Sequence, residues 1–273
     1  MMLRTRVITA VVMLAVLLAV LLSHSYLVVA AMASLFFAAA CWESLRLFGQ
    51  RRPEIGSALW TVVFAYIAFR AQSFNAPLVF GLCVAIWCIR LIPSLKVGLP
   101  AIDSAGNRIL TVIYGLAIFG CFLAILAFYR HSATYLLSAM AVVWVADIGA
   151  YFAGKAFGKR KLAPAISPGK SWEGAIGGWL AVLLLAAASI QCPLLTDTFA
   201  ADMVARFGWI RTGVLLTLAV AASVAGDLFE SQLKRRAQVK DSSNLLPGHG
   251  GVLDRIDALI PAMPLMALAS FLG

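Results

Sequence analysis

The sequence predicts an all-α, polytopic membrane protein with about nine transmembrane helices. Of its 273 residues, 62% are hydrophobic and only 12% are charged, and the mean hydropathy is +0.93. A helix needs ~20 apolar residues to cross the hydrocarbon layer of a bilayer. Apolar segments of about this length recur from one end of the chain to the other, which excludes an ordinary soluble domain.

Nine apolar segments are the candidate spans: residues 7–22, 26–45, 57–69, 76–92, 109–129, 133–153, 175–196, 212–229 and 258–272. Residues 109–129 are the clearest span because they contain no charged residue, and residues 57–69 are the shortest. Arg4 and Arg6 before the first segment are also typical of a signal peptide. However, apolar residues resume directly after Ser25 without a suitable cleavage site, so we expect the first segment to be retained as a helix.

The distribution of positive charge predicts the orientation in the membrane. With the N-terminus in the cytoplasm and nine spans, most of the 22 Lys and Arg residues lie on the cytoplasmic side. The opposite side then contains only Arg70, Arg130, Arg206 and Arg211. Because Lys and Arg are retained in cytoplasmic loops, we expect a bacterial-type cytoplasmic (inner) membrane protein with an external C-terminus. Its net charge of +10 then faces anionic headgroups. No soluble segment interleaves aromatic residues with bases, so we expect no nucleic-acid partner.

Acidic residues divide the chain near residue 130. Residues 1–130 contain only three of the 12 acids, and we expect them to form an N-terminal transmembrane scaffold. Residues 131–273 contain the other acids and are expected to be the catalytic region of the same integral membrane unit. The five cysteines include no CxxC pair and mostly lie in apolar segments, which favours buried apolar side chains over a metal site or a disulfide.

The most polar part of the chain begins inside the eighth predicted span. Asp227, Glu230, Ser231, Lys234 and Arg235 are spaced so that they share one face of a helix. Carboxylates bind a hard divalent cation and basic groups neutralise phosphate oxygens, so this stripe suits a metal–nucleotide complex. The alternative is a set of salt bridges within a solvated helix. An unused acid at the membrane depth of Asp227 would be costly, which favours function.

A glycine-rich turn and a second acidic element follow, with the candidate residues Lys240, Asp241, His249, Gly250, Gly251, Asp254, Arg255 and Asp257. A backbone without side chains at Gly250 and Gly251 can approach a phosphate closely and donate N–H groups to it. Asp254 could complete the metal site that Asp227 begins. His249 is either catalytic or structural, with its ring bonded to the backbone.

The loop before the seventh predicted span is the second basic segment. Gly169, Lys170 and Ser171 resemble the end of a P-loop, but the Walker pattern requires glycine where Pro164 stands, and we expect no preceding strand. Residues 167–169, beginning with Ser167, are therefore predicted to form a turn that presents Lys170 to a phosphate. Asp147, an acid inside the sixth span, is a further candidate to bind ribose, base or metal; it could also pair with a lysine at the helix end.

Residues 147–152, 166–174 and 231–257 together resemble the phosphatidate cytidylyltransferases. The resemblance implies synthesis of CDP-diacylglycerol and pyrophosphate from CTP and phosphatidic acid, a membrane lipid, at the cytoplasmic leaflet. It implies Asp227 and Asp254 as ligands of Mg²⁺, with a second cation such as K⁺, and it allows a homodimer. The catalytic set is then Asp227, Ser231, Lys234, Arg235, Asp254 and Arg255. The substrate-binding set is Asp147, Ser167, Lys170, Lys240, Asp241, His249, Gly250, Gly251 and Asp257.

Three other functions fit the sequence less well. The CDP-alcohol phosphatidyltransferases need an Asp-Gly-x-x-Ala-Arg run, which the sequence does not contain. A CTP-dependent polyprenol kinase would transfer the γ-phosphate and release CDP, so its products distinguish it. An ion-coupled transporter places its acids near the midplane on broken helices, whereas the acids here cluster at one face beside a basic loop.

Overall fold

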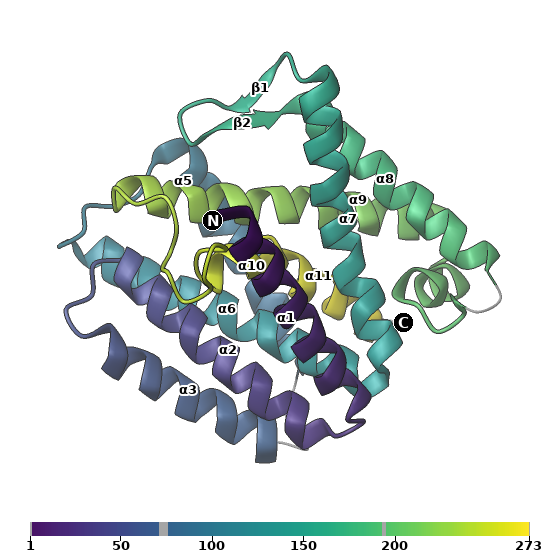
Figure 1. Cartoon of the computed structure of the whole chain (residues 1–273), viewed down its shortest axis with the longest axis horizontal. Coiled ribbons are helices and arrows are strands. Elements are labelled where there is room, and N and C mark those ends of the chain that lie inside the picture. Colours follow the sequence, from purple (N-terminus) through teal and green to yellow (C-terminus); the bar gives the residue numbers. More distant parts are fainter. Residues whose placement is uncertain (1, 71–75, 193–194, 273) are drawn as a thin grey trace.

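The computed structural model describes residues 2–70, 76–192 and 195–272, which form helices and one short β-hairpin (Figure 1). The helices of the N-terminal half are α1 (Met2–Leu22), α2 (Tyr26–Leu47), α3 (Pro53–Arg70), α4 (Ala76–Ile86), the π-helical turn η1 (Trp87–Leu91), α5 (Ile92–Val97) and α6 (Ala105–His131). The C-terminal half contains α7 (Ala133–Phe157), β1 (Lys161–Ala163), β2 (Ser167–Ser171), α8 (Trp172–Gln191), α9 (Phe199–Arg236), α10 (Leu253–Ile256) and α11 (Leu259–Phe271). The predicted all-α class is confirmed apart from the hairpin.

Within the described part of the chain, six helices are long and apolar enough to cross a membrane. They are Tyr26–Leu47, Ala76–Val97, Ala105–His131, Ala133–Phe157, Trp172–Gln191 and Phe199–Arg236. The protein is therefore an integral membrane protein with several apolar helices, while nine spans and their orientation stay predictions. The apolar part of α1 and the whole of α11 are shorter, and residues 193–194 of the predicted span 175–196 lie outside the described residues.

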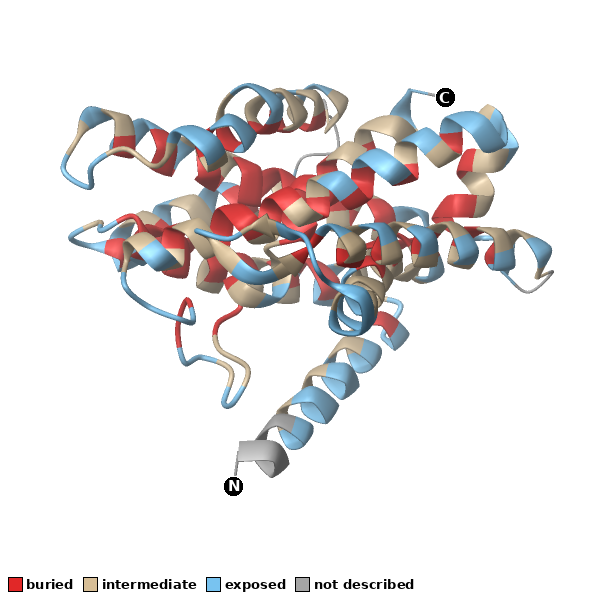
Figure 2. Ribbon diagram, turned by 90° about the horizontal axis from the view of Figure 1, so that it is seen from above, coloured by how far each residue is buried: buried red, intermediate tan, exposed pale blue. Residues whose placement is uncertain are grey.

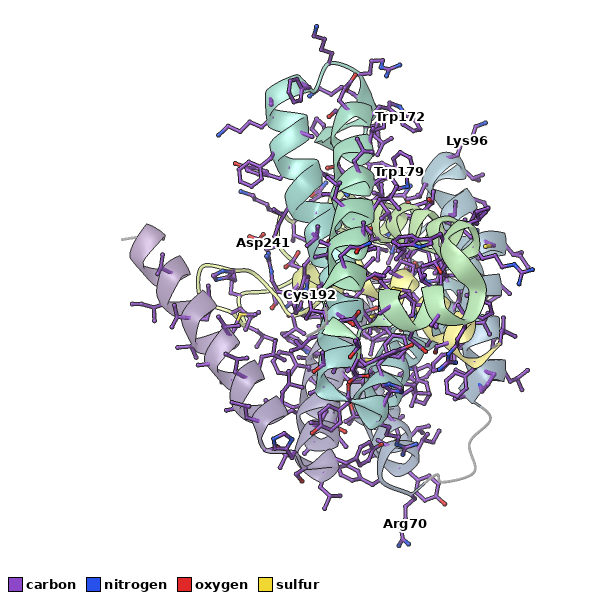
Figure 3. The ribbon with its side chains drawn as sticks, turned by 90° about the vertical axis from the view of Figure 1, so that its right-hand side faces the viewer. Arg70, Lys96, Trp172, Trp179, Cys192 and Asp241 are labelled. Carbon is purple, nitrogen blue, oxygen red and sulfur yellow. The ribbon has the colours of Figure 1, made fainter. Side chains whose placement is uncertain are left out.

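The interior is built around α6, which packs against α2, α4, α7 and α11. Figure 2 shows the buried residues concentrated in the middle of the bundle and α1 projecting from it, with mostly exposed residues from Val7 on. In Figure 3, Lys96 and Arg70 lie toward opposite ends of the molecule. That separation is expected for residues on opposite sides of a membrane.

Small residues allow α7 and α8 to pack closely. A Cβ atom added to Gly177 would lie 2.2 Å from the Cβ of Ala153, and one added to Gly178 would lie 2.3 Å from the carbonyl oxygen of Ala146. Such contacts between small residues let membrane helices approach each other closely without loss of packing. The approach places Asp147 of α7 beside the loop that leads into α8.

Two sequence predictions for that loop are wrong. Residues 167–169 belong to strand β2, and the turn lies three residues earlier, at Pro164, whose missing N–H and fixed φ suit a turn. Strand β1 precedes Lys170, where no strand was expected, and it pairs antiparallel with β2 so that Lys161 lies opposite Ser171. The P-loop remains excluded, since Lys170 lies within the strand itself.

Candidate active site

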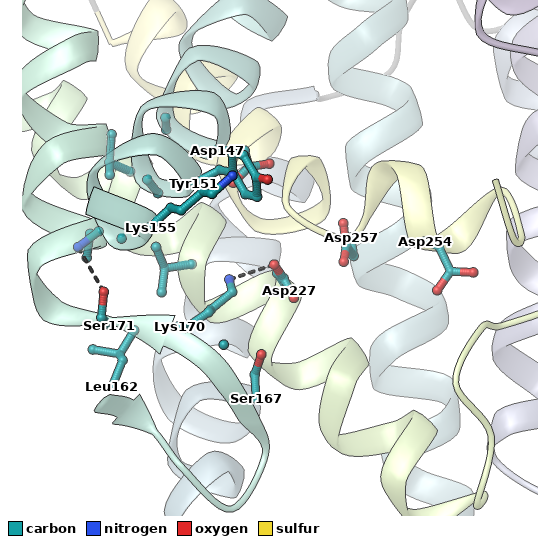
Figure 4. Close-up of a pocket in the computed structure, with 18 of the residues that line it drawn as sticks. Asp147, Tyr151, Lys155, Leu162, Ser167, Lys170, Ser171, Asp227, Asp254 and Asp257 are labelled. Carbon is teal, nitrogen blue, oxygen red and sulfur yellow. Dashed lines mark hydrogen bonds and ion pairs between the residues drawn. The ribbon is translucent and has the colours of Figure 1, made fainter. Parts of the chain in front are cut away.

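A cavity of about 560 Å³ lies between α7, the β-hairpin, α8, α9 and the segment that includes α10 (Figure 4). Seven residues predicted from the sequence line it: Asp147, Ser167, Lys170, Asp227, Asp254, Arg255 and Asp257. They come from four regions of the chain, so the structure brings the two polar segments together around one cavity.

Lys170 and Asp227 form an ion pair across this cavity. The Nζ atom of Lys170 lies 2.6 Å from Oδ2 of Asp227, and the Ser231 hydroxyl donates to Oδ1 of Asp227 at 3.2 Å. Figure 4 shows Lys170 extending from the hairpin toward α9. The Asp227 side chain remains 31% exposed, so its carboxylate can be reached from the cavity.

The hairpin that carries Lys170 is fixed to the start of α8. The Ser171 hydroxyl accepts a hydrogen bond from the N–H of Gly174 and so caps the helix. The Glu173 carboxylate accepts hydrogen bonds from the N–H groups of Lys159 and Arg160, and the Arg160 side chain also donates to it. These contacts hold both ends of the hairpin, so the position of Lys170 is set by short-range bonds.

Asp254 has its oxygens fully engaged by the protein. Its Oδ1 lies 2.6 Å from Nζ of Lys234, and its Oδ2 accepts from the N–H and the hydroxyl of Ser242 and from the N–H of Gly251, each at 2.8 Å. Burial would raise the pKa of Asp254, but hydrogen bonding from Lys234 and Gly251 outweighs it and lowers the pKa to about 2. Lys234 also pairs with the fully buried Glu230. Asp254 is therefore an ionised carboxylate.

Asp257 completes the row of acids along the cavity. Burial, together with the nearby negative charge of Asp227, raises the pKa of Asp257 to about 8. Gly226 lets the two acids approach, because a Cβ atom there would lie 2.3 Å from the carbonyl oxygen of Asp257. Among the described residues, no three Asp, Glu, His or Cys side chains are close enough together to hold a metal ion unaided.

The other predicted site residues lie outside the cavity wall. Ser231 and Lys234 contact its acids, and Arg235 donates to the carbonyl oxygen of Ile166 in the hairpin turn. Lys240 and Asp241 are exposed beyond the end of α9, and Figure 3 shows Asp241 at the surface.

The glycines of the turn contact carboxylates of the protein itself. Gly250 has φ +84°, and a Cβ atom there would lie 2.8 Å from Oδ2 of Asp254. The N–H of Gly251 already donates to Asp254. The Nδ1 atom of His249 is buried and has no hydrogen-bond partner among the described residues. The predicted phosphate contacts of these residues stay predictions.

Several residues of this region were not predicted from the sequence. Lys155 and Tyr151 of α7 line the cavity, and Glu43 of α2 is fully buried against the segment that precedes Asp254. The sequence did contain a signal for Glu43, since an acid inside an apolar span is a functional candidate by default. The proposed boundary at residue 130 remains a prediction, although Glu43 links the N-terminal half directly to the site.

Comparison with known proteins relates the chain to one group of enzymes. A family model described as the cytidylyltransferase family matches residues 4–272. The chain is 35% identical over 291 residues to a phosphatidate cytidylyltransferase of Haemophilus influenzae, with 99% of each protein covered. It is 39% identical over 277 residues to that of Pseudomonas aeruginosa, covering 97% of this chain and 96% of the relative. A phosphatidate cytidylyltransferase of Bacillus subtilis is 39% identical over 169 residues, covering 60% of this chain and 57% of the relative.

Proposed function

Because the chain belongs to the cytidylyltransferase family, we propose that it transfers CMP from CTP to phosphatidic acid, giving CDP-diacylglycerol and pyrophosphate. The similarity over nearly the whole chain to two phosphatidate cytidylyltransferases carries this proposal. The cavity supports it, because basic and acidic side chains converge beside apolar helices, as a reaction between a nucleotide and a lipid requires.

The reaction joins two anions. An oxygen of the lipid phosphate attacks the α-phosphorus of CTP, the bond from that phosphorus to the bridging oxygen breaks, and pyrophosphate leaves. The lipid phosphate is already charged, so no covalent nucleophile from the protein is needed. Unscreened, the reactants would repel each other. Lys170 and Arg255, which both line the cavity, would neutralise phosphate oxygens and hold the two reactants in line.

The acids of the cavity fit a hard cation. Asp147, Asp227, Asp254 and Asp257 all line the cavity, and carboxylate oxygens are ligands that Mg²⁺ and K⁺ accept. We assign Asp227 as the main ligand, because it is exposed to the cavity and its partner Lys170 could turn to a phosphate instead. Asp254 is the second predicted ligand, although Lys234 contacts one of its oxygens and Ser242 and Gly251 donate to the other. When bound, Mg²⁺ would supply charge neutralisation and polarise the α-phosphate.

The lipid would enter this site laterally from the membrane, past α7. Ile148, Tyr151 and Phe152 of α7 are 57–65% exposed and apolar or aromatic, which suits contact with acyl chains. Tyr151 also lines the cavity, and Lys155 follows it by one helical turn at the cavity wall. We place the cavity at the cytoplasmic face of the inner membrane, in keeping with the charge distribution. A homodimer is a further proposal.

Product analysis tests the proposed function. Purified protein would be incubated with CTP labelled at the α-phosphate, phosphatidic acid and Mg²⁺. We expect label in a CDP-lipid and release of unlabelled pyrophosphate. Release of labelled CDP, with no label in the lipid, would instead indicate transfer of the γ-phosphate and a lipid kinase. No turnover of CTP in the presence of phosphatidic acid would contradict the proposed function, and a parallel incubation with a polyprenol in place of phosphatidic acid tests the kinase.

A further inference from the structure

Glu43 is a buried acid of α2 whose hydrogen-bond donors all lie in the segment 242–253. Its side chain is 0% exposed. The donors are the hydroxyls of Ser242 and Ser243 and the N–H groups of Val252 (3.1 Å) and Leu253 (2.6 Å). Among the described residues no Lys, Arg or His pairs with it. A buried carboxylate is costly unless donors satisfy it, so these bonds hold the segment against α2.

The same bonds extend to Asp254. The Ser242 hydroxyl lies 3.2 Å from Oε2 of Glu43 and 2.8 Å from Oδ2 of Asp254, so it contacts both carboxylates. The hydroxyl has one hydrogen, which the two carboxylates must share, so the positions of the two acids are linked. Asp254 in turn contacts Lys234 of α9. Glu43 is thus the first member of a chain of contacts that leads from α2 to the cavity wall.

The close packing of Glu43 against the backbone explains why position 251 is a glycine. A Cβ atom on Gly251 would lie 2.4 Å from Oε1 of Glu43 and 2.1 Å from Oγ of Ser242, closer than real contacts allow. The segment therefore fits closely around a carboxylate supplied from 199 residues away in the sequence.

We propose that Glu43 is a positioning residue for the reaction: it fixes the segment 242–253 so that Asp254 and Asp257 face the cavity. Glu43 does not line the cavity, so it acts through this segment and does not contact substrate. The inference rests on the proposed function only for its kinetic readout, because the placement of the segment can be measured without activity.

The test is Glu43→Gln in the full-length protein, with Glu54→Gln on the exposed start of α3 as the control. The amide has the same shape as the carboxylate, but its NH₂ group faces donors and cannot accept from them. We expect faster hydrogen exchange at the amides of Val252 and Leu253, with α6 still protected. We also expect kcat to fall by ~10-fold or more, because charged hydrogen bonds are lost, while KM for CTP changes less.

A second variant keeps the proposal testable if Glu43→Gln does not fold. Ser243→Ala removes one donor and leaves Glu43 in place, so we expect the same local change in exchange and a smaller fall in kcat. Unchanged exchange in the segment, or a rise that includes α6, would overturn the proposal. So would a kcat equal to that of the control. If hydrogen exchange rises locally in Glu43→Gln but the unmodified protein shows no cytidylyl transfer, the result would support the role of Glu43 in placing the segment and reject the proposed function.

Discussion

Substitution of Lys170 is expected to distinguish a catalytic effect from a structural one most clearly. In Lys170→Ala the ammonium group 2.6 Å from Asp227 is removed. At an effective dielectric constant of ~20, such a pair gains roughly 6 kcal/mol of Coulomb attraction before desolvation. The two side chains are 23% and 31% exposed, so water can replace much of this interaction, and we expect a loss of about 1 kcal/mol in stability.

The loss in activity should be larger than this loss in stability. If Lys170 stabilises phosphate charge in the transition state, its removal should lower kcat/KM by ~10²–10³-fold, comparable with removing one donor from an oxyanion hole. Initial rates would be measured in mixed micelles against CTP and against phosphatidic acid, together with the melting temperature of each variant.

Lys159→Ala is the matched control for this measurement. Lys159 lies in the same loop, and its contact to Glu173 uses only the backbone N–H, which alanine retains. We expect wild-type kinetics from it. A Lys170→Ala enzyme whose kcat/KM stays within ~3-fold of this control for both substrates would refute the catalytic reasoning. Lys170 would then be one of several loop lysines that the bias of positive charge toward one side of the membrane explains without any catalytic role.

Three further predictions test the rest of the site. Asp254→Asn should abolish turnover while membrane insertion stays normal; near-normal formation of CDP-diacylglycerol would contradict its role. Gly226→Ala should destabilise the protein by ~1–3 kcal/mol through its clash with Asp257, whereas Gly213→Ala, with open space around it, should not; equal melting temperatures would refute this. Lys155→Ala should raise KM for phosphatidic acid by ~10-fold and leave KM for CTP unchanged, as measured by varying each substrate in turn. A change in KM for CTP alone would reject binding of the lipid beside Lys155.

The sequence predicted the local part of the site well. Asp227, Ser231 and Lys234 repeat with the helical period, and all three lie on the part of α9 that follows the break in the helix at Gly208 (φ +76°). This part of the prediction succeeded because the helical period brings together residues that are three or four apart along the chain. The turn before Lys170 was misplaced for the opposite reason: pairing of β1 with β2 is decided by cross-strand contacts, which a single loop sequence specifies weakly.

The apolar pattern and the spacing of acids and bases thus determined a helical membrane protein and a set of candidate site residues, seven of which line one cavity. Only the tertiary structure decided which of them face one another. Glu43 shows the physical reason: its sequence context is an apolar helix, and its four donors lie about 200 residues away. A buried carboxylate must find donors wherever packing brings them, and packing is a property of the whole bundle. Likewise, the small residues of α7 and α8 and the glycine at 226 set how closely Asp147, Lys170 and Asp257 can converge.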